Sequence, residues 1–156
     1  MTKVFEKLLA HDPSAIGVDL YRDIPVPPGS EELNELLTNE KRIIIIEKYG
    51  DDRSKHVAGP EVLRGTEQIG FSDVTVDDDG VVRRGLLFLD DGENFSVSLA
   101  LRLSMLYLAK EGITPQPGDP NPEHIRLGSV TIEPFEADDA VYINADARGY
   151  QYLLDY

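Results

Sequence analysis

The sequence contains no cysteine, no tryptophan and no apolar stretch as long as a membrane-spanning helix. Without cysteine there are no disulfides, thiolate-bound zinc ions, iron–sulfur clusters or thiol nucleophiles. The same absence leaves the compartment open, because a cysteine-free chain tolerates both the cytoplasm and the oxidising space outside it. The best candidate for a membrane span, Val97 to Ala109, is too short and is interrupted by Arg102.

Basic residues are also scarce, with 15 Lys and Arg against 29 Asp and Glu and a formal net charge of −14. A surface of this charge repels phosphate backbones, so nucleic acid is not expected as a partner. The simplest interpretation of the acidity is solubility. The length of 156 residues, with 41% hydrophobic and 28% charged residues, predicts one globular domain over residues 1–156.

The first third of the chain predicts a parallel βαβ unit. Apolar residues at helical spacing predict a helix over Val4 to Ala10, and the apolar run Ala15 to Leu20 predicts a buried strand. A second helix is expected from an N-capping Ser30 to Leu37, with acidic residues in its first turn. Four consecutive β-branched residues, Ile43 to Ile46, then predict a central strand that is buried on both faces.

The rest of the chain predicts mainly antiparallel strands. An antiparallel hairpin is expected from strands Gly70 to Val76 and Val81 to Leu89, joined by a tight turn at Asp77, Asp79 and Gly80. A deeply packed helix is expected from about Ser96 to Lys110. The remaining expectations are a loop at Thr114 to Pro122, strands at Arg126 to Phe135 and Ala140 to Asn144, and a terminal strand or turn at Tyr150 to Tyr156. The fold class is α/β: a single domain whose mixed sheet has a parallel βαβ core and antiparallel hairpin strands, flanked by helices.

The motifs of common catalytic and metal sites are missing. An EF-hand loop centred on Gly80 would need a bidentate glutamate where Leu86 stands, so the acidic turn is interpreted as capped by its own aspartates. The three histidines are scattered and form no H-E-x-x-H pair. The sequence also lacks a G-x-S-x-G elbow, a P-loop and a G-x-G-x-x-G turn. Neither a metal ion nor a cofactor is therefore expected.

Two polar clusters remain as a candidate site. Asp19, Arg22 and Asp23 follow the first strand, at the edge where parallel sheets open crevices for ligands. Arg83 and Arg84 are adjacent in a strand, so one of them faces inward and needs a carboxylate partner. The expected partners are Asp19, Asp23 and Asp73. The cluster either clamps a small polar ligand or is a structural ion-pair network, and the structural interpretation is preferred.

Several blocks, in order along most of the chain, resemble the CHASE domains of type two, the cyclase- and histidine-kinase-associated sensory extracellular domains. The blocks are Ala15 to Gly29, Gly70 to Asp73, Asp77 to Arg84 with Leu86 and Leu87, Ser98 to Ala100, Tyr107 to Ala109, and Gly149 to Tyr156. The family pattern usually begins with an upstream strand, whereas Met1 to Glu6 enters directly at the later helix. One strand of the full sheet is therefore expected to be missing.

The resemblance implies a non-catalytic sensory domain outside the cytoplasmic membrane, periplasmic or on the cell surface. Its parent would be a bacterial membrane-anchored receptor, homodimeric, with a histidine kinase, nucleotide cyclase or Ser/Thr kinase as output. An unknown small molecule is the expected partner.

Two other functions stay open on the sequence alone. One is a metal-dependent hydrolase that uses Asp19, Asp73 and Asp79. The other is a structural dimerisation module, to whose exposed patch the tyrosines near the C-terminus would contribute, although tyrosines in strands more often pack into a core. Those tyrosines are Tyr142, Tyr150, Tyr152 and Tyr156.

Overall fold

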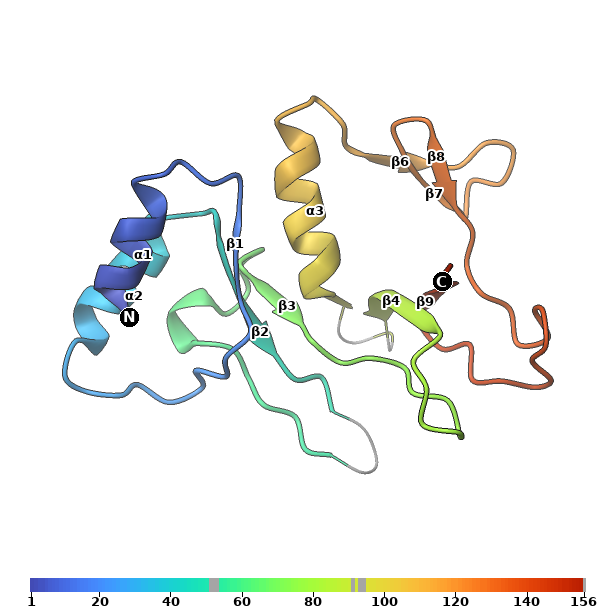
Figure 1. Cartoon of the computed structure of the whole chain (residues 1–156), viewed down its shortest axis with the longest axis horizontal. Coiled ribbons are helices and arrows are strands. Elements are labelled where there is room, and N and C mark those ends of the chain that lie inside the picture. Colours follow the sequence, from blue (N-terminus) through green and yellow to red (C-terminus); the bar gives the residue numbers. More distant parts are fainter. Residues whose placement is uncertain (51–53, 91, 93–94, 156) are drawn as a thin grey trace.

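The computed structural model describes residues 1–50, 54–90, 92 and 95–155. Within these residues the chain forms helices and strands in mixed order (Figure 1). The elements are α1 (Thr2–Leu9), β1 (Ile16–Val18), α2 (Ser30–Asn39), β2 (Ile43–Glu47), the 3-10 helix η1 (Glu61–Leu63), β3 (Ile69–Phe71), β4 (Arg84–Asp90), β5 (Phe95–Val97), α3 (Leu99–Ala109), β6 (Pro115–Pro117), β7 (Ile125–Leu127), β8 (Val130–Ile132) and β9 (Tyr150–Leu153).

The predicted parallel βαβ unit is confirmed. β1, α2 and β2 follow one another in the chain, and β1 pairs parallel with β2. β3 pairs parallel with the other edge of β2, which gives the strand order β1-β2-β3. The four isoleucines of β2 are at most 2% exposed, as expected for a central strand covered on both faces.

Helices cover both faces of this sheet. Ile43 and Ile45 belong to a core cluster with Phe5 of α1 and Leu37 of α2. Ile44, on the opposite face, lines a cavity together with residues of α3. A Cβ atom on Gly17, the register partner of Ile44, would lie 2.7 Å from a methyl group of Leu103, so α3 packs closely against β1.

The helix ends differ in part from the expectations. α2 begins at Ser30, but its N-cap is Gly29, in a left-handed conformation with φ of 91° and no capping side chain. The predicted N-cap role of Ser30 is therefore wrong. In α3 the Oγ atom of Ser98 accepts a hydrogen bond of 3.2 Å from the Leu101 amide. This helix is shallower than expected, because Leu101 is its buried residue and Tyr107 is 55% exposed.

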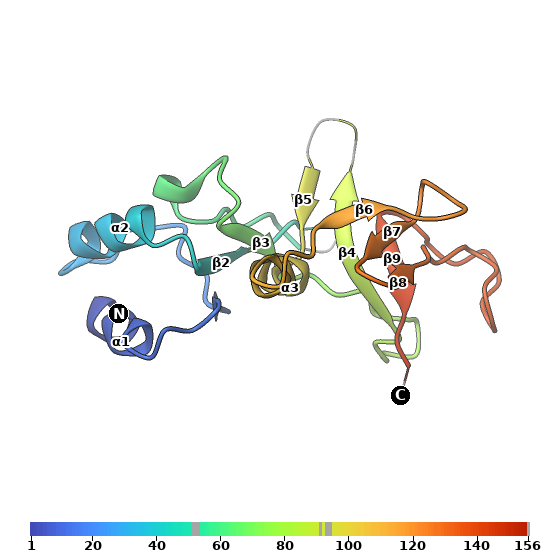
Figure 2. The ribbon, with the colours of Figure 1, turned by 90° about the horizontal axis from the view of Figure 1, so that it is seen from above.

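The antiparallel strands lie in two further small sheets within the described residues, with orders β5-β4-β9 and β6-β7-β8. The view from above shows β4 and β9 beside α3, on the side away from α1 and α2 (Figure 2). An isolated parallel bridge between Phe71 and Ser98 connects the first sheet to the residue after β5. The fold class is thus α/β as predicted, with the parallel and antiparallel strands in separate small sheets.

The predicted hairpin of residues 70–76 and 81–89 is wrong. The turn at Asp77 to Gly80 is present, and one antiparallel bridge, between Thr75 and Arg84, joins the segments before and after it. The first arm, however, pairs with β2, and β4 pairs with β5 and β9. Val74 and Val76, whose alternation suggested a strand, are 62% and 54% exposed, so this stretch crosses from one sheet to the next.

The C-terminal third shows further corrections. The stretch 114–122 contains the edge strand β6 instead of being all loop. Residues 126–135 form parts of β7 and β8, which pair antiparallel in register Arg126–Thr131. Residues 140–144 form no strand. The terminal segment, expected as a strand or a turn, forms the strand β9 from Tyr150 to Leu153; Tyr156 lies outside the described residues.

Gly70 tests the contact between β3 and α3. A Cβ atom at this position would lie 2.8 Å from the backbone N and Cα atoms of Leu99, which cannot move without shifting the helix. Gly70→Ala should therefore lower the free energy of unfolding by about 1–3 kcal/mol in denaturant titrations. Gly17→Ala is the matched control, because its Cβ meets the mobile end of Leu103 and should cost less. Equal effects of the two substitutions would contradict this account.

Candidate functional site

The buried arginine expected from the sequence is Arg84. Its side chain is 6% exposed, and its Nη2 atom lies 2.7 Å from Oδ1 of Asp77. Nη1 donates to the backbone carbonyl of Asp146 at 2.8 Å and to Oε1 of Gln151 at 3.0 Å. The guanidinium carbon lies 5.0 Å from the centres of the Phe135 and Tyr142 rings. This arginine joins the acidic turn, the loop before β9 and β9 itself.

Asp77 has further partners on its second oxygen. The Tyr142 hydroxyl donates to Oδ2 at 2.7 Å, and Nη1 of Arg83 lies 3.0 Å from the same atom. Arg83 also donates two hydrogen bonds to Asp79, of 2.9 and 2.7 Å. Hydrogen bonds from Tyr142 and then from the two arginines lower the pKa of Asp77 to about 2.

The partner expected for the inward arginine was wrong. Asp77, assigned only to a turn, pairs with Arg84 in place of Asp19, Asp23 or Asp73. Asp19 is exposed and forms no ion pair with any described residue. Asp73 instead accepts hydrogen bonds from the backbone amides that follow β2: Tyr49 at 2.8 Å and Gly50 at 3.3 Å.

Arg22 and Asp23 lie elsewhere again. They line a cavity of about 200 Å³ between the β1–α2 connection, α2 and η1. The residues expected to form one polar centre are thus distributed over separate places. Of these residues, Arg84, which begins β4, and Arg83, which precedes it, share a partner in Asp77.

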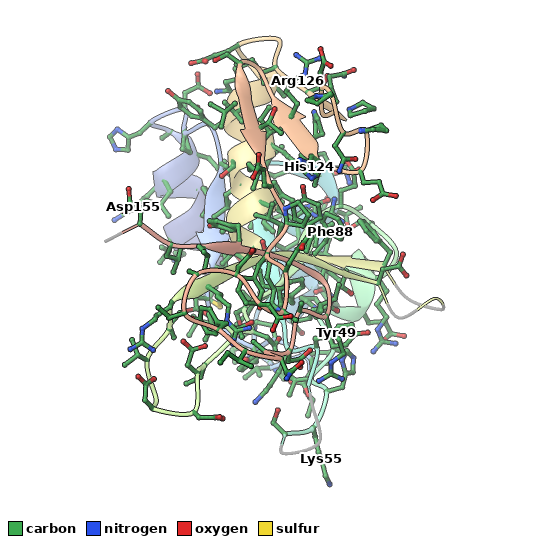
Figure 3. The ribbon with its side chains drawn as sticks, turned by 90° about the vertical axis from the view of Figure 1, so that its right-hand side faces the viewer. Tyr49, Lys55, Phe88, His124, Arg126 and Asp155 are labelled. Carbon is green, nitrogen blue, oxygen red and sulfur yellow. The ribbon has the colours of Figure 1, made fainter. Side chains whose placement is uncertain are left out.

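A cavity of about 690 Å³ opens beside the carboxyl end of β2. Its walls come from the end of β2, the stretch from His56 to Ile69, strand β5 and Arg102 of α3. Val57 forms an antiparallel bridge with Lys48, the residue after β2, and this bridge brings the His56–Gly59 stretch alongside the end of β2. Figure 3 labels Tyr49, whose side chain lines this cavity, and places it on the opposite side of Phe88 from Arg126.

Charged residues of both signs, Glu47, Arg64 and Arg102, line this cavity. Oε1 of Glu47 accepts a hydrogen bond of 3.2 Å from the Ser96 hydroxyl. Nε of Arg102 donates to the Ile69 carbonyl at 3.2 Å, and its Nη1 is 3.7 Å from Glu67. Burial lowers the pKa of Arg102, and the negative charges of Glu67 and Glu47 offset part of this shift.

The carboxylates required by the hydrolase hypothesis have separate environments. Asp73 bonds to the backbone after β2, and Asp79 bonds to Arg83. The described part of the chain contains no group of three His, Cys, Asp or Glu side chains placed to hold a metal ion. Within the same residues no helix has the length and apolar character needed to cross a membrane.

The tyrosines proposed for an exposed patch are mostly packed inside. Tyr150 is 7% exposed, and Tyr152 packs against the same core cluster. Tyr142 bonds to Asp77. The hypothesis of a tyrosine patch is therefore not supported by the described tyrosines.

Comparison with known proteins places the chain in a family of sensory domains. The family model of the CHASE2 domain matches residues 1–156, the whole chain, so the protein belongs to the CHASE2 family, as the sequence blocks indicated. CHASE2 domains are extracellular sensory domains of signalling receptors. No curated protein and no solved structure matches the chain.

Sequence reasoning missed the cavity residues, although a signal existed for two of them. Arg102 is the sole charge in the apolar run 97–109, and such a residue needs a polar partner or a ligand. Glu47 ends the four-isoleucine strand at the carboxyl edge of the sheet. The pairing of Arg84 with Asp77, seven positions earlier, had no comparable signal.

Replacing each arginine in turn separates the buried ion pair from the exposed one. Arg84→Met leaves a carboxylate without its buried partner and should lower the free energy of unfolding by roughly 3–5 kcal/mol in denaturant titrations. Arg83→Met is the control, because the Arg83 side chain is 41% exposed and its loss should lower the free energy of unfolding much less. A negligible effect of Arg84→Met would contradict its role as an anchor.

Tyr142→Phe tests the acid sensitivity that Asp77 confers. The pKa of Asp77 lies below its ordinary value of 3.8, so its stabilising contribution is complete above pH 3.8 and is lost as the pH falls to about 2. Removal of the Tyr142 hydroxyl should raise this pKa, so the variant should lose less stability than the parent between those two pH values. The measurement is a series of denaturant titrations, with Tyr152→Phe as control. Parallel pH profiles for the parent and Tyr142→Phe would contradict the assignment.

Proposed function

We propose that this CHASE2 domain is the extracytoplasmic input domain of a membrane-anchored bacterial receptor, where it binds a small molecule and passes on a conformational signal. The placement is periplasmic or on the cell surface, as part of an inner-membrane protein. The output is a histidine kinase, a nucleotide cyclase or a Ser/Thr kinase. The domain itself has no catalytic role.

The observation that carries the ligand-binding part is the cavity of about 690 Å³ beside β2. Its volume falls in the range of small-molecule sites, and apolar and aromatic residues line it together with charged groups that can fix the orientation of a ligand. Its position at the carboxyl end of a parallel strand is where ligands bind in open α/β sheets.

The construction of the cavity supports a role in signalling. Glu47 and Ile69 belong to the parallel sheet, whereas Phe95 belongs to β5 and Arg102 to α3. A ligand that contacts all of these elements has a different affinity for different arrangements of them. It then shifts the population toward the arrangement that it binds best, and a sensor needs such a shift.

In a homodimeric parent receptor, such a change of arrangement in one copy of the domain can be passed to the second copy through their contact. Apolar side chains in the β1–α2 connection are available for contact with a second copy. They are Leu20, Ile24 and Val26, which are 59%, 67% and 56% exposed.

A thermal-shift screen tests the proposed function. The chain is mixed separately with amino acids, sugars, nucleotides, organic acids and divalent ions, with ethylenediaminetetraacetate as a control for metals. A ligand at about a hundred times its dissociation constant should add about 2.7 kcal/mol to the stability and raise the melting midpoint. A hit on a divalent ion, abolished by the chelator, would favour the hydrolase hypothesis over a sensor. The absence of any hit would contradict ligand sensing by this domain.

A further inference from the structure

Among the charged residues that line the cavity beside β2, Glu47 and Arg102 have opposite charges and do not pair with each other. Glu47 is held by Ser96, and Arg102 is held by the Ile69 carbonyl. Among the ion pairs of the described residues, none joins Glu47 to Arg102. A cavity that keeps a carboxylate and a guanidinium apart is suited to a ligand with charges of both signs.

The backbone positions behind these two charges lie close together. Arg102 is fixed at Ile69, and Glu47 is the register partner of Phe71 on the same strand β3. Two residues of strand correspond to roughly 7 Å. Both charges are therefore anchored near one another, at the same end of the parallel sheet.

Both groups keep hydrogen-bonding capacity for a ligand. The hydrogen bond from Ser96 uses one Glu47 oxygen, Oε1, and within the described residues Oε2 has no partner. In Arg102 the Nε atom donates to the Ile69 carbonyl, and the 3.7 Å between Nη1 and Glu67 exceeds a hydrogen-bond distance. The guanidinium can therefore offer its Nη donors to a carboxylate.

Apolar and aromatic residues form part of the remaining wall, beside the polar Thr66 and the charged Arg64. Tyr49, Phe95, Ile69 and Val97 line the same cavity as the two charges. The Phe95 side chain is 62% exposed, which is unusual for a large aromatic side chain and leaves it available to a ligand. Its ring lies 5.3 Å from that of Phe88, which supports it from behind.

We propose that this cavity binds an α-amino acid with a large apolar side chain. Arg102 takes the carboxylate, Glu47 takes the ammonium group, and Tyr49 and Phe95 contact the side chain. This proposal rests on the proposed function, namely that the domain senses a small molecule, and it names the class of that molecule.

The charges of the protein favour a zwitterion over a simple ion. The chain carries a net charge of −14, which repels anions from a distance. The cavity is instead lined by two guanidinium groups, of Arg64 and Arg102, against the carboxylate of Glu47, and this excess of positive charge disfavours a cation. A molecule with both charges and no net charge is repelled by neither.

Isothermal titration calorimetry of the whole chain with three matched probes tests the proposal. The probes are L-phenylalanine, phenylpropionate, which lacks the ammonium group, and phenethylamine, which lacks the carboxylate. Phenylalanine should bind at least roughly tenfold more tightly than either analogue, because each analogue loses a charge-assisted hydrogen bond. L-leucine and L-tryptophan extend the series to other apolar side chains.

Two substitutions then assign the charges within the cavity. Glu47→Gln should abolish the preference for phenylalanine over phenylpropionate, and Arg102→Gln should abolish the preference over phenethylamine. These preferences are ratios, so a general loss of stability would not remove one of them selectively. Arg102→Lys should restore part of the second preference, because it keeps the charge. Lys110→Gln, which removes a cation from the end of the same helix outside the cavity, should leave both preferences unchanged.

The outcomes separate the two proposals. Absence of binding by all three amino acids overturns the amino-acid assignment, and a hit from another class in the thermal-shift screen would keep the sensory function. Preferences that persist in both Glu47→Gln and Arg102→Gln overturn the location of the site. Failure of every compound in both experiments overturns the sensory function itself.

Discussion

The burial of both faces of β2 is the constraint on which the domain depends. Four consecutive isoleucines have no polar face to turn to water, so each side of the strand needs a cover. α1 and α2 cover one side and α3 the other. Glu47 is the first polar position of the strand, and there β2 passes from the buried core to the wall of the cavity. The location of the candidate site is thus a consequence of where the isoleucine run ends.

Strand β4, in the second half of the chain, also has an apolar run, Leu86 to Leu89, but among these four residues only Leu87 is buried, and a buried ion pair gives a further anchor. Arg84 ties the acidic turn, the loop at Asp146 and strand β9 to one point, and Phe135 and Tyr142 shield it from water. Burying an arginine is costly unless its hydrogen bonds are satisfied, so such a pair selects one arrangement of these segments among many. The hydrogen bonds of Arg84 that the structure describes all go to this network, and its carboxylate partner is not one of those expected from the sequence.

Features that depend on neighbouring residues were predictable from the sequence, whereas those that depend on pairing between distant segments were not. The βαβ unit was predictable because the isoleucine run and the helix before it are local patterns with little ambiguity. The hairpin was not, because β4 takes β9 as its partner, more than sixty residues downstream, and alternation in Val74 and Val76 says nothing of pairing. An inward arginine was predictable from strand alternation, but its partner was not, since Asp19, Asp23 and Asp73 were equally plausible and only the folded turn brings Asp77 to Arg84. The cavity depends on segments from four parts of the chain and had no local signature.

The position of the cavity explains how a small ligand can act on the whole domain. The parallel sheet and the antiparallel part meet at the bridge between Phe71 and Ser98, beside which Ser72 donates its amide to the Glu47 carbonyl. Glu47 lies on one side of this junction, and Ser96 and Arg102 flank Ser98 on the other. A ligand held between Glu47 and Arg102 therefore spans the junction. Its binding energy depends on how the two parts sit against each other, whereas a ligand confined to one part would shift no such equilibrium.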